Sequence, residues 1–73
     1  MMKTEEHIVS IIKKMKSSDF DENNLIRSGF LDSFDMIKLI DIIATEFKKN
    51  IEGKDITEEN FNSVKRIAAL VDR

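Results

Sequence analysis

Neither a disulfide nor a Cys/His zinc site can stabilise this chain, because its 73 residues include no cysteine and a single histidine, His7. A domain of this size must therefore depend on the packing of its apolar side chains. The chain has no proline, and its only glycines are Gly29 and Gly53, so helical segments are seldom interrupted. We expect a single all-α domain that covers residues 1–73.

Apolar residues at helical spacing predict two longer helices, separated by a loop. The first helix covers residues 3–16, with Thr4 as its cap. Its buried face is predicted to consist of Ile8, Ile11, Ile12 and Met15. The second helix begins at Asp32 and Ser33 and continues to about residue 49. Its predicted buried stripe consists of Met36, Ile37, Ile40, Ile43, Ala44 and Phe47.

Two further helices are expected near the end of the chain. Thr57 is placed to cap a short third helix, with Ile56 packed on Phe61 as a hydrophobic staple. Ser63 starts the last helix, and its predicted buried residues are Val64, Ile67, Ala68 and Val71. The loop of residues 17–31 is expected to be fixed to the core by Leu25, Ile26, Phe30 and Leu31. Together these elements predict a four-helix bundle with a short third helix and a long loop between helices 1 and 2.

The charge balance argues against several classes of partner. The net charge is −2 at pH 7, whereas nucleic-acid binders concentrate Lys and Arg on one face. No apolar run has the length of a membrane span, and no signal-peptide segment is evident at the start of the chain. We therefore expect a cytoplasmic, monomeric protein that neither binds nucleic acid nor inserts into a membrane.

The reactive side chains argue against an enzyme. The chain has neither cysteine nor tyrosine, and a serine nucleophile needs a base that a third group holds in place. His7 lies one position before the apolar stripe of the first helix, which is typical of a surface or boundary histidine. The sequence also marks no pair of carboxylates as sharing a pocket.

The segment most suggestive of function precedes the second helix and reads Gly29-Phe30-Leu31-Asp32-Ser33-Phe34. A serine at a helix N-terminus lies where the helix dipole and free backbone N–H groups favour an anion, such as a phosphate ester. Asp32 can cap the helix or hold a metal ion. The Asp-Ser dipeptide alone also fits an ordinary N-cap without any further role.

This segment resembles the attachment motif of the acyl and peptidyl carrier proteins, which reads Asp-Ser-Leu or sometimes Asp-Ser-Phe. In that family the motif follows a glycine-containing loop and opens an aliphatic helix, which here contains Ile37, Leu39 and Ile40. Residues 55–64 and 67–71 look like the short third helix and the final helix of the family. The resemblance therefore extends over essentially the whole chain.

The resemblance implies that Ser33 receives a 4′-phosphopantetheine arm from coenzyme A and that Asp32 assists this transfer. A separate, Mg²⁺-dependent phosphopantetheinyl transferase attaches the arm in that family. The terminal thiol of the arm then carries an acyl or aminoacyl group as a thioester between a loading ligase and downstream acyltransferases or synthases. A chain without cysteine is compatible with a thiol that a cofactor supplies.

The outward face of the second helix is expected to contact these partner enzymes. Opposite charges and apolar side chains are mixed on it, which favours a dedicated partner; its residues are Phe34, Asp35, Lys38, Asp41 and Ile42. Two residues separate Gly29 from Asp32, a spacing similar to that of D-alanyl carriers and specialised carriers, whereas carriers of fatty-acid biosynthesis more usually have one. A helical protein-interaction module without an arm is the alternative from another class.

Overall fold

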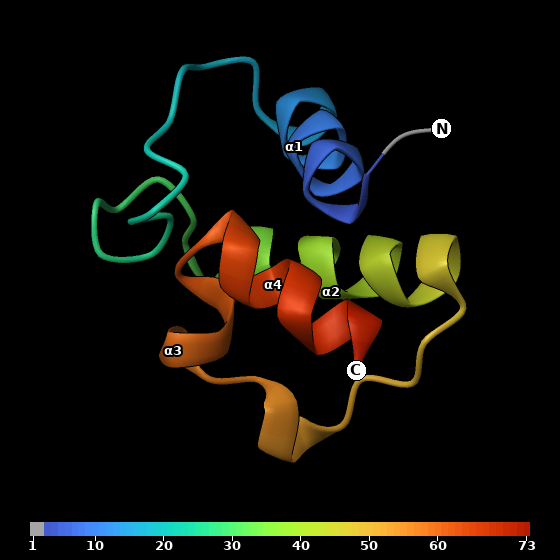
Figure 1. The fold of residues 1–73 in the computed structure, drawn as a ribbon. Coiled ribbons are helices and arrows are strands. Elements are labelled where there is room, and N and C mark those ends of the chain that lie inside the picture. Colours follow the sequence, from blue (N-terminus) through green and yellow to red (C-terminus); the bar gives the residue numbers. More distant parts are fainter. Residues whose placement is uncertain (1–2) are drawn as a thin grey trace.

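The computed structural model describes residues 3–73, which form helices and no strand. The α-helices are α1 (Thr4–Met15), α2 (Ser33–Phe47), α3 (Glu58–Phe61) and α4 (Val64–Asp72), and a short 3-10 helix, η1, covers Gly53–Asp55. Figure 1 shows their order along the chain. The all-α prediction is confirmed for the described residues. None of their helices is both long enough and apolar enough to cross a membrane.

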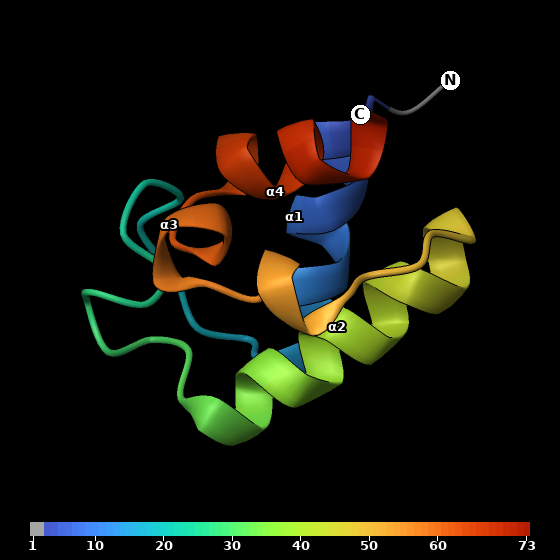
Figure 2. The same cartoon turned by 90° about the horizontal axis from the view of Figure 1, so that it is seen from below.

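The helices enclose a core to which every helix except η1 contributes apolar side chains. α1 packs against both α2 and α4, and α3 packs against α4 (Figures 1 and 2). The beginning of α1 is joined to the end of α4, where the Thr4 hydroxyl donates a hydrogen bond to Asp72 at 3.0 Å. The fully buried side chains of largest volume are Phe61, Ile8, Ile12, Leu25, Leu39, Ile43, Ile67 and Val64.

The predicted cap of α1 is wrong. Lys3 occupies the N-cap position without a side-chain hydrogen bond, and Thr4 is already the first helical residue. The His7 N–H bonds to the Lys3 carbonyl at 2.9 Å, so the helix starts one residue earlier than the cap prediction requires. The Thr4 hydroxyl instead bonds to α4. The buried face is confirmed for three isoleucines, whereas Met15 is only half-buried.

The predicted buried stripe of α2 is wrong at Ile37, which is 65% exposed, and it omits Leu39, which is fully buried. α2 packs most closely against α1, on one side, so the buried face is centred on Leu39 and Ile43 rather than on Ile37 and Ile40. Ile42 was expected to face outward, but this side chain is half-buried and packs against the core. The other predicted stripe residues are half-buried: Met36, Ile40, Ala44 and Phe47.

The last two helices begin where the sequence predicts. The hydroxyl of Thr57 accepts the Asn60 N–H at 3.1 Å, and that of Ser63 accepts the Arg66 N–H at 3.1 Å. Ile56, the proposed staple residue, remains exposed. The predicted buried face of the last helix is confirmed at all four positions: Val64, Ile67, Ala68 and Val71.

The long loop between α1 and α2 is fixed to the body of the molecule, beside α3 (Figures 1 and 2). Leu25 and Leu31 are buried, as predicted, and Ile26 and Phe30 are half-buried. The buried side chain of Asn62, at the end of α3, accepts the N–H groups of Ile26 and Arg27 at 2.9 and 3.0 Å. Its amide nitrogen donates to the Asn23 carbonyl at 3.1 Å. Asn62 therefore holds three points of the loop, a role that the sequence analysis missed.

Candidate functional site at the start of α2

The chain reaches α2 through a tight turn. Gly29 has a φ of 83°, in the left-handed region that favours glycine, and its N–H bonds to the Ile26 carbonyl at 2.9 Å. Two residues later the Leu31 N–H bonds to the Leu25 carbonyl at 3.0 Å, while the Leu31 side chain is buried in the core. The residues directly before Asp32 are thus held by both the backbone and the core.

A capping box starts α2. The Asp32 carboxylate accepts the Asp35 N–H at 2.9 Å, and the Asp35 carboxylate accepts the Asp32 N–H at 3.2 Å. Each carboxylate therefore satisfies a backbone N–H group that the first turn of a helix leaves without an intrahelical partner. The reciprocal bonds fix the backbone on both sides of Ser33.

Ser33 is the first residue of α2 and is exposed to solvent. It follows the capping residue and does not cap the helix itself, since Asp32 has that role. The plain N-cap interpretation of the dipeptide is thus confirmed at Asp32, and the Ser33 hydroxyl takes no part in the capping box. Asp32, its neighbour, is also exposed.

The Asp35 carboxylate is held from α1 as well. Lys16, directly after α1, donates from Nζ to Asp35 Oδ2 at 3.0 Å and to the Phe30 carbonyl at 2.6 Å. The Lys16 ammonium, together with the Asp32 N–H, holds the pKa of Asp35 below its ordinary value. Lys16 Nζ also lies 4.9 Å from the centroid of the Phe30 ring, which stacks on Phe20 at 5.0 Å.

The five predicted partner-contact residues differ in their exposure to solvent. Phe34 is 77% exposed, and Lys38 and Asp41 are exposed, as expected. Asp35 is engaged in the capping box, and Ile42 is turned toward α1. The exposed apolar residue that the sequence analysis missed is Ile37, one turn after Ser33. Its exposure could have been inferred from Leu39 and Ile43, which are spaced four residues apart. A buried face centred on these two residues leaves Ile37 outside it.

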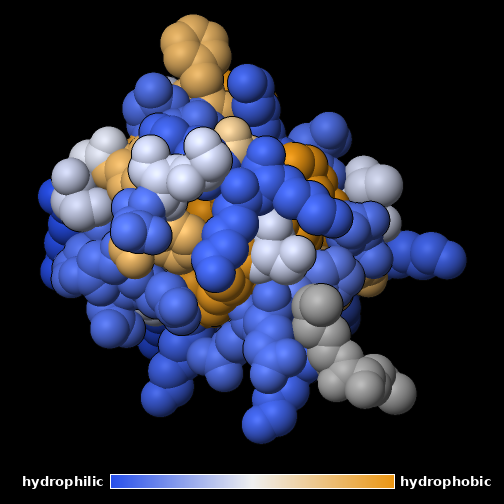
Figure 3. Space-filling model, turned by 90° about the horizontal axis from the view of Figure 1, so that it is seen from above, coloured by the Kyte–Doolittle hydropathy of each residue, from blue (hydrophilic) through white to orange (hydrophobic). Residues whose placement is uncertain are grey.

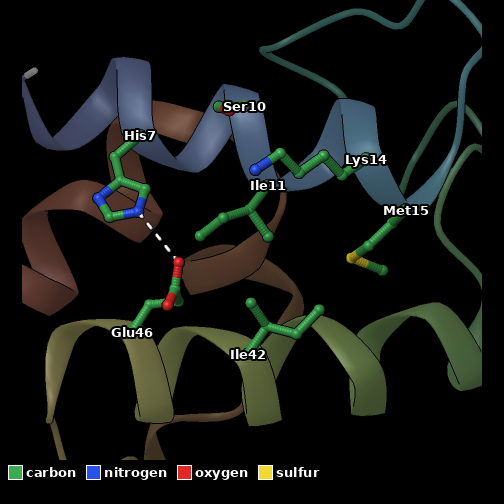
Figure 4. Close-up of a pocket in the computed structure, with 7 residues that line it drawn as sticks. All are labelled: His7, Ser10, Ile11, Lys14, Met15, Ile42 and Glu46. Carbon is green, nitrogen blue, oxygen red and sulfur yellow. Dashed lines mark hydrogen bonds and ion pairs between the residues drawn. The ribbon is translucent and has the colours of Figure 1, made fainter.

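An open groove of about 430 Å³ lies between α1 and α2, and its lining residues are His7, Ser10, Ile11, Lys14, Met15, Ile42 and Glu46 (Figure 4). His7 is half-buried at its edge, so its expected boundary position is confirmed. Its Nε2 lies 3.4 Å from Glu46 Oε1, and its ring centroid lies 4.6 Å from that of Phe47. On the face seen in Figure 3 apolar side chains are visible between mostly hydrophilic ones.

The described part of the chain contains no cluster of side chains that could bind a metal ion. Among residues 3–73, no group of three or more His, Cys, Asp or Glu side chains is arranged to hold a metal ion. Asp32 and Asp35 bond to each other's backbone and not to a common centre.

Comparisons with known proteins do not assign the chain to a family. No protein family, no curated protein and no solved structure matches it.

Proposed function

We propose that this protein is a carrier that bears a 4′-phosphopantetheine arm on Ser33 and is not itself an enzyme. The observation that carries the proposal is the arrangement at the start of α2: an exposed serine hydroxyl directly after an exposed aspartate whose carboxylate caps the helix. The preceding loop is anchored to the core, so a modifying enzyme meets a defined backbone and not a mobile segment.

The residues present fit a phosphodiester at Ser33. Ser33 is exposed, and a phosphate attached to its oxygen lies at the N-terminus of a helix of 15 residues, whose dipole favours negative charge. Asp32, Ser33 and Phe34 are all exposed, so the attachment point faces solvent. The arm supplies a thiol, which this chain lacks.

Attachment of the arm is the transfer of a phosphopantetheine group from coenzyme A to the Ser33 oxygen. The Ser33 oxygen attacks the phosphorus of coenzyme A that bears the pantetheine, the phosphoanhydride bond breaks, and adenosine 3′,5′-bisphosphate leaves. The proton of the Ser33 hydroxyl goes to a base of the transferase. In this scheme Asp32 presents its carboxylate beside the reacting oxygen, where it can share in the binding of the Mg²⁺ that the transferase brings.

The exposed residues of α2 near Ser33 are proposed as the contact surface for partner enzymes. Phe34 and Ile37 are large apolar side chains in water, and Lys38 and Asp41 add one charge of each sign. Such a surface suits a dedicated loading ligase, for an acyl or a D-alanyl or other aminoacyl group, better than general electrostatic steering. In the same proposal the arrangement of α1 to α4 is the four-helix bundle of carrier proteins.

The mass of the intact protein tests the proposal. After incubation with coenzyme A, Mg²⁺ and a phosphopantetheinyl transferase, the wild type is expected to gain the mass of one arm and the Ser33→Ala variant to gain nothing. Ser63→Ala is the matched control, because Ser63 also precedes a helix but follows Asn62 and not an aspartate. Modification of Ser33→Ala, or no modification of the wild type by several transferases, would overturn the proposal in favour of an interaction module.

A further inference from the structure

Lys16 joins the end of α1 to both sides of the proposed attachment site. Its Nζ reaches the Phe30 carbonyl, two residues before Asp32, and the Asp35 carboxylate, two residues after Ser33. The bonds measure 2.6 Å to the Phe30 carbonyl and 3.0 Å to Asp35, and the ammonium makes both charge-assisted. A single ammonium group thus holds the segment on either side of the Asp-Ser dipeptide.

The contact with Asp35 extends to the backbone of Asp32. The same oxygen, Asp35 Oδ2, accepts from Lys16 Nζ and from the Asp32 N–H. Removal of the ammonium would leave the Asp35 side chain free to rotate away, and the Asp32 N–H would lose its acceptor. The Asp32 backbone would then be held less firmly, and the position of its carboxylate, which caps the helix through the Asp35 N–H, would be less defined.

Lys16 differs from the other lysines at the end of α1 in its burial and its contacts. Its side chain is 34% exposed and the Asp35 side chain 16%, so the pair is partly shielded from water. Its ammonium also lies near the Phe30 ring, which is stacked on Phe20. Lys13, three residues earlier, is exposed and makes no ion pair or side-chain hydrogen bond within residues 3–73.

We infer that Lys16 is a positioning residue for the modification of Ser33: it sets the geometry in which the Asp32 carboxylate and the Ser33 hydroxyl are presented to the transferase. The inference rests on the proposed carrier function. Lys16 does not touch the reacting atoms, and its influence passes through Asp35 and Phe30. A small displacement of a reacting group is enough to lower a rate by one or two orders of magnitude.

The test compares Lys16→Met, which keeps the length of the side chain but removes its charge, with Lys16→Arg and with the control Lys13→Met. Arm transfer from coenzyme A is followed by intact mass at several carrier concentrations, which separates kcat from KM. For Lys16→Met we expect kcat to fall on the order of tenfold with KM nearly unchanged. Lys16→Arg should restore most of the lost rate, and Lys13→Met should match the wild type.

Amide exchange supplies a second readout that needs no transferase. The Asp32 N–H is expected to exchange faster in Lys16→Met than in the wild type, while amides of α4 keep their protection. An unchanged kcat in a folded Lys16→Met, or an increase in KM with kcat retained, would overturn the inference; the second result would mean direct contact with the transferase. Failure of the wild type to accept the arm would instead refute the carrier function itself, and unchanged Asp32 exchange would refute the positioning role independently.

Discussion

Replacing Asn62 by alanine tests how the loop before the candidate site is held. The side chain of Asn62 is 9% exposed and makes three hydrogen bonds to the loop, with the N–H groups of Ile26 and Arg27 and the carbonyl of Asn23. A hydrogen bond of this kind contributes about 1 kcal/mol net. Asn62→Ala is therefore expected to lower the free energy of unfolding by about 3 kcal/mol.

The assay is urea denaturation followed by far-ultraviolet circular dichroism, supported by thermal melting. For a domain of this size, a loss of about 3 kcal/mol corresponds to a decrease in Tm of roughly 12–24 °C. Asn60→Ala is the matched control, because the Asn60 side chain makes one such bond, to the Asp55 carbonyl at 2.9 Å. It should lose about 1 kcal/mol.

Amide exchange locates the effect. In Asn62→Ala the N–H groups of Ile26 and Arg27 should lose protection first, because their acceptor is gone. If Asn62→Ala were no less stable than Asn60→Ala, or if these two amides exchanged as in the wild type, the loop would not be held by Asn62, and the reasoning would be refuted.

Three further predictions concern α2. In urea denaturation, Leu39→Ala should lower the free energy of unfolding by about 2–5 kcal/mol, whereas Ile37→Ala should change it by less than about 0.5 kcal/mol. Equal losses would contradict the observed buried face. Phe34→Ala should keep the fold and weaken acyl loading, whereas Ile42→Asp should destabilise the protein, since Ile42 packs against the core. Because the pKa of Asp35 is lower in the folded state, its ionised carboxylate stabilises the fold. This contribution to the free energy of unfolding is complete above the unfolded-state pKa of about 4 and is lost as the pH falls through the lower folded-state pKa. Urea denaturation of the wild type at a series of acid pH values should show this loss.

The helices with one clear apolar stripe could be predicted from sequence. In α4, Val64, Ile67, Ala68 and Val71 recur at a single helical spacing, and all four are buried. The starts of α3 and α4 could be predicted too, because Thr57 and Ser63 cap these helices by hydrogen bonds to residues three positions later. These capping bonds form between residues close in sequence and do not depend on the rest of the fold.

The phase of α2 could not be predicted in the same way. Six of the eight residues 36–43 are apolar, so more than one face of this helix could be the buried one. The choice depends on α1, which covers the side of Leu39 and Ile43. Lys16 and Asn62 left no signal either, because their partners lie 14 to 39 residues away in the chain.

The excess of apolar residues on α2 has a consequence for the candidate site. Once α1 has covered one face, Phe34 and Ile37 remain in water, 77% and 65% exposed, and both lie within one turn of Ser33. Exposed apolar side chains add nothing to the stability of the folded monomer, but they become favourable when a partner buries them. The capping bonds of Asp32 and Asp35 and the ion pair with Lys16 hold the start of the helix, whereas the exposed side chains of Phe34 and Ile37 take no part in these bonds. Under the proposed carrier function, this separation gives the transferase a fixed serine and leaves an apolar surface for a partner enzyme.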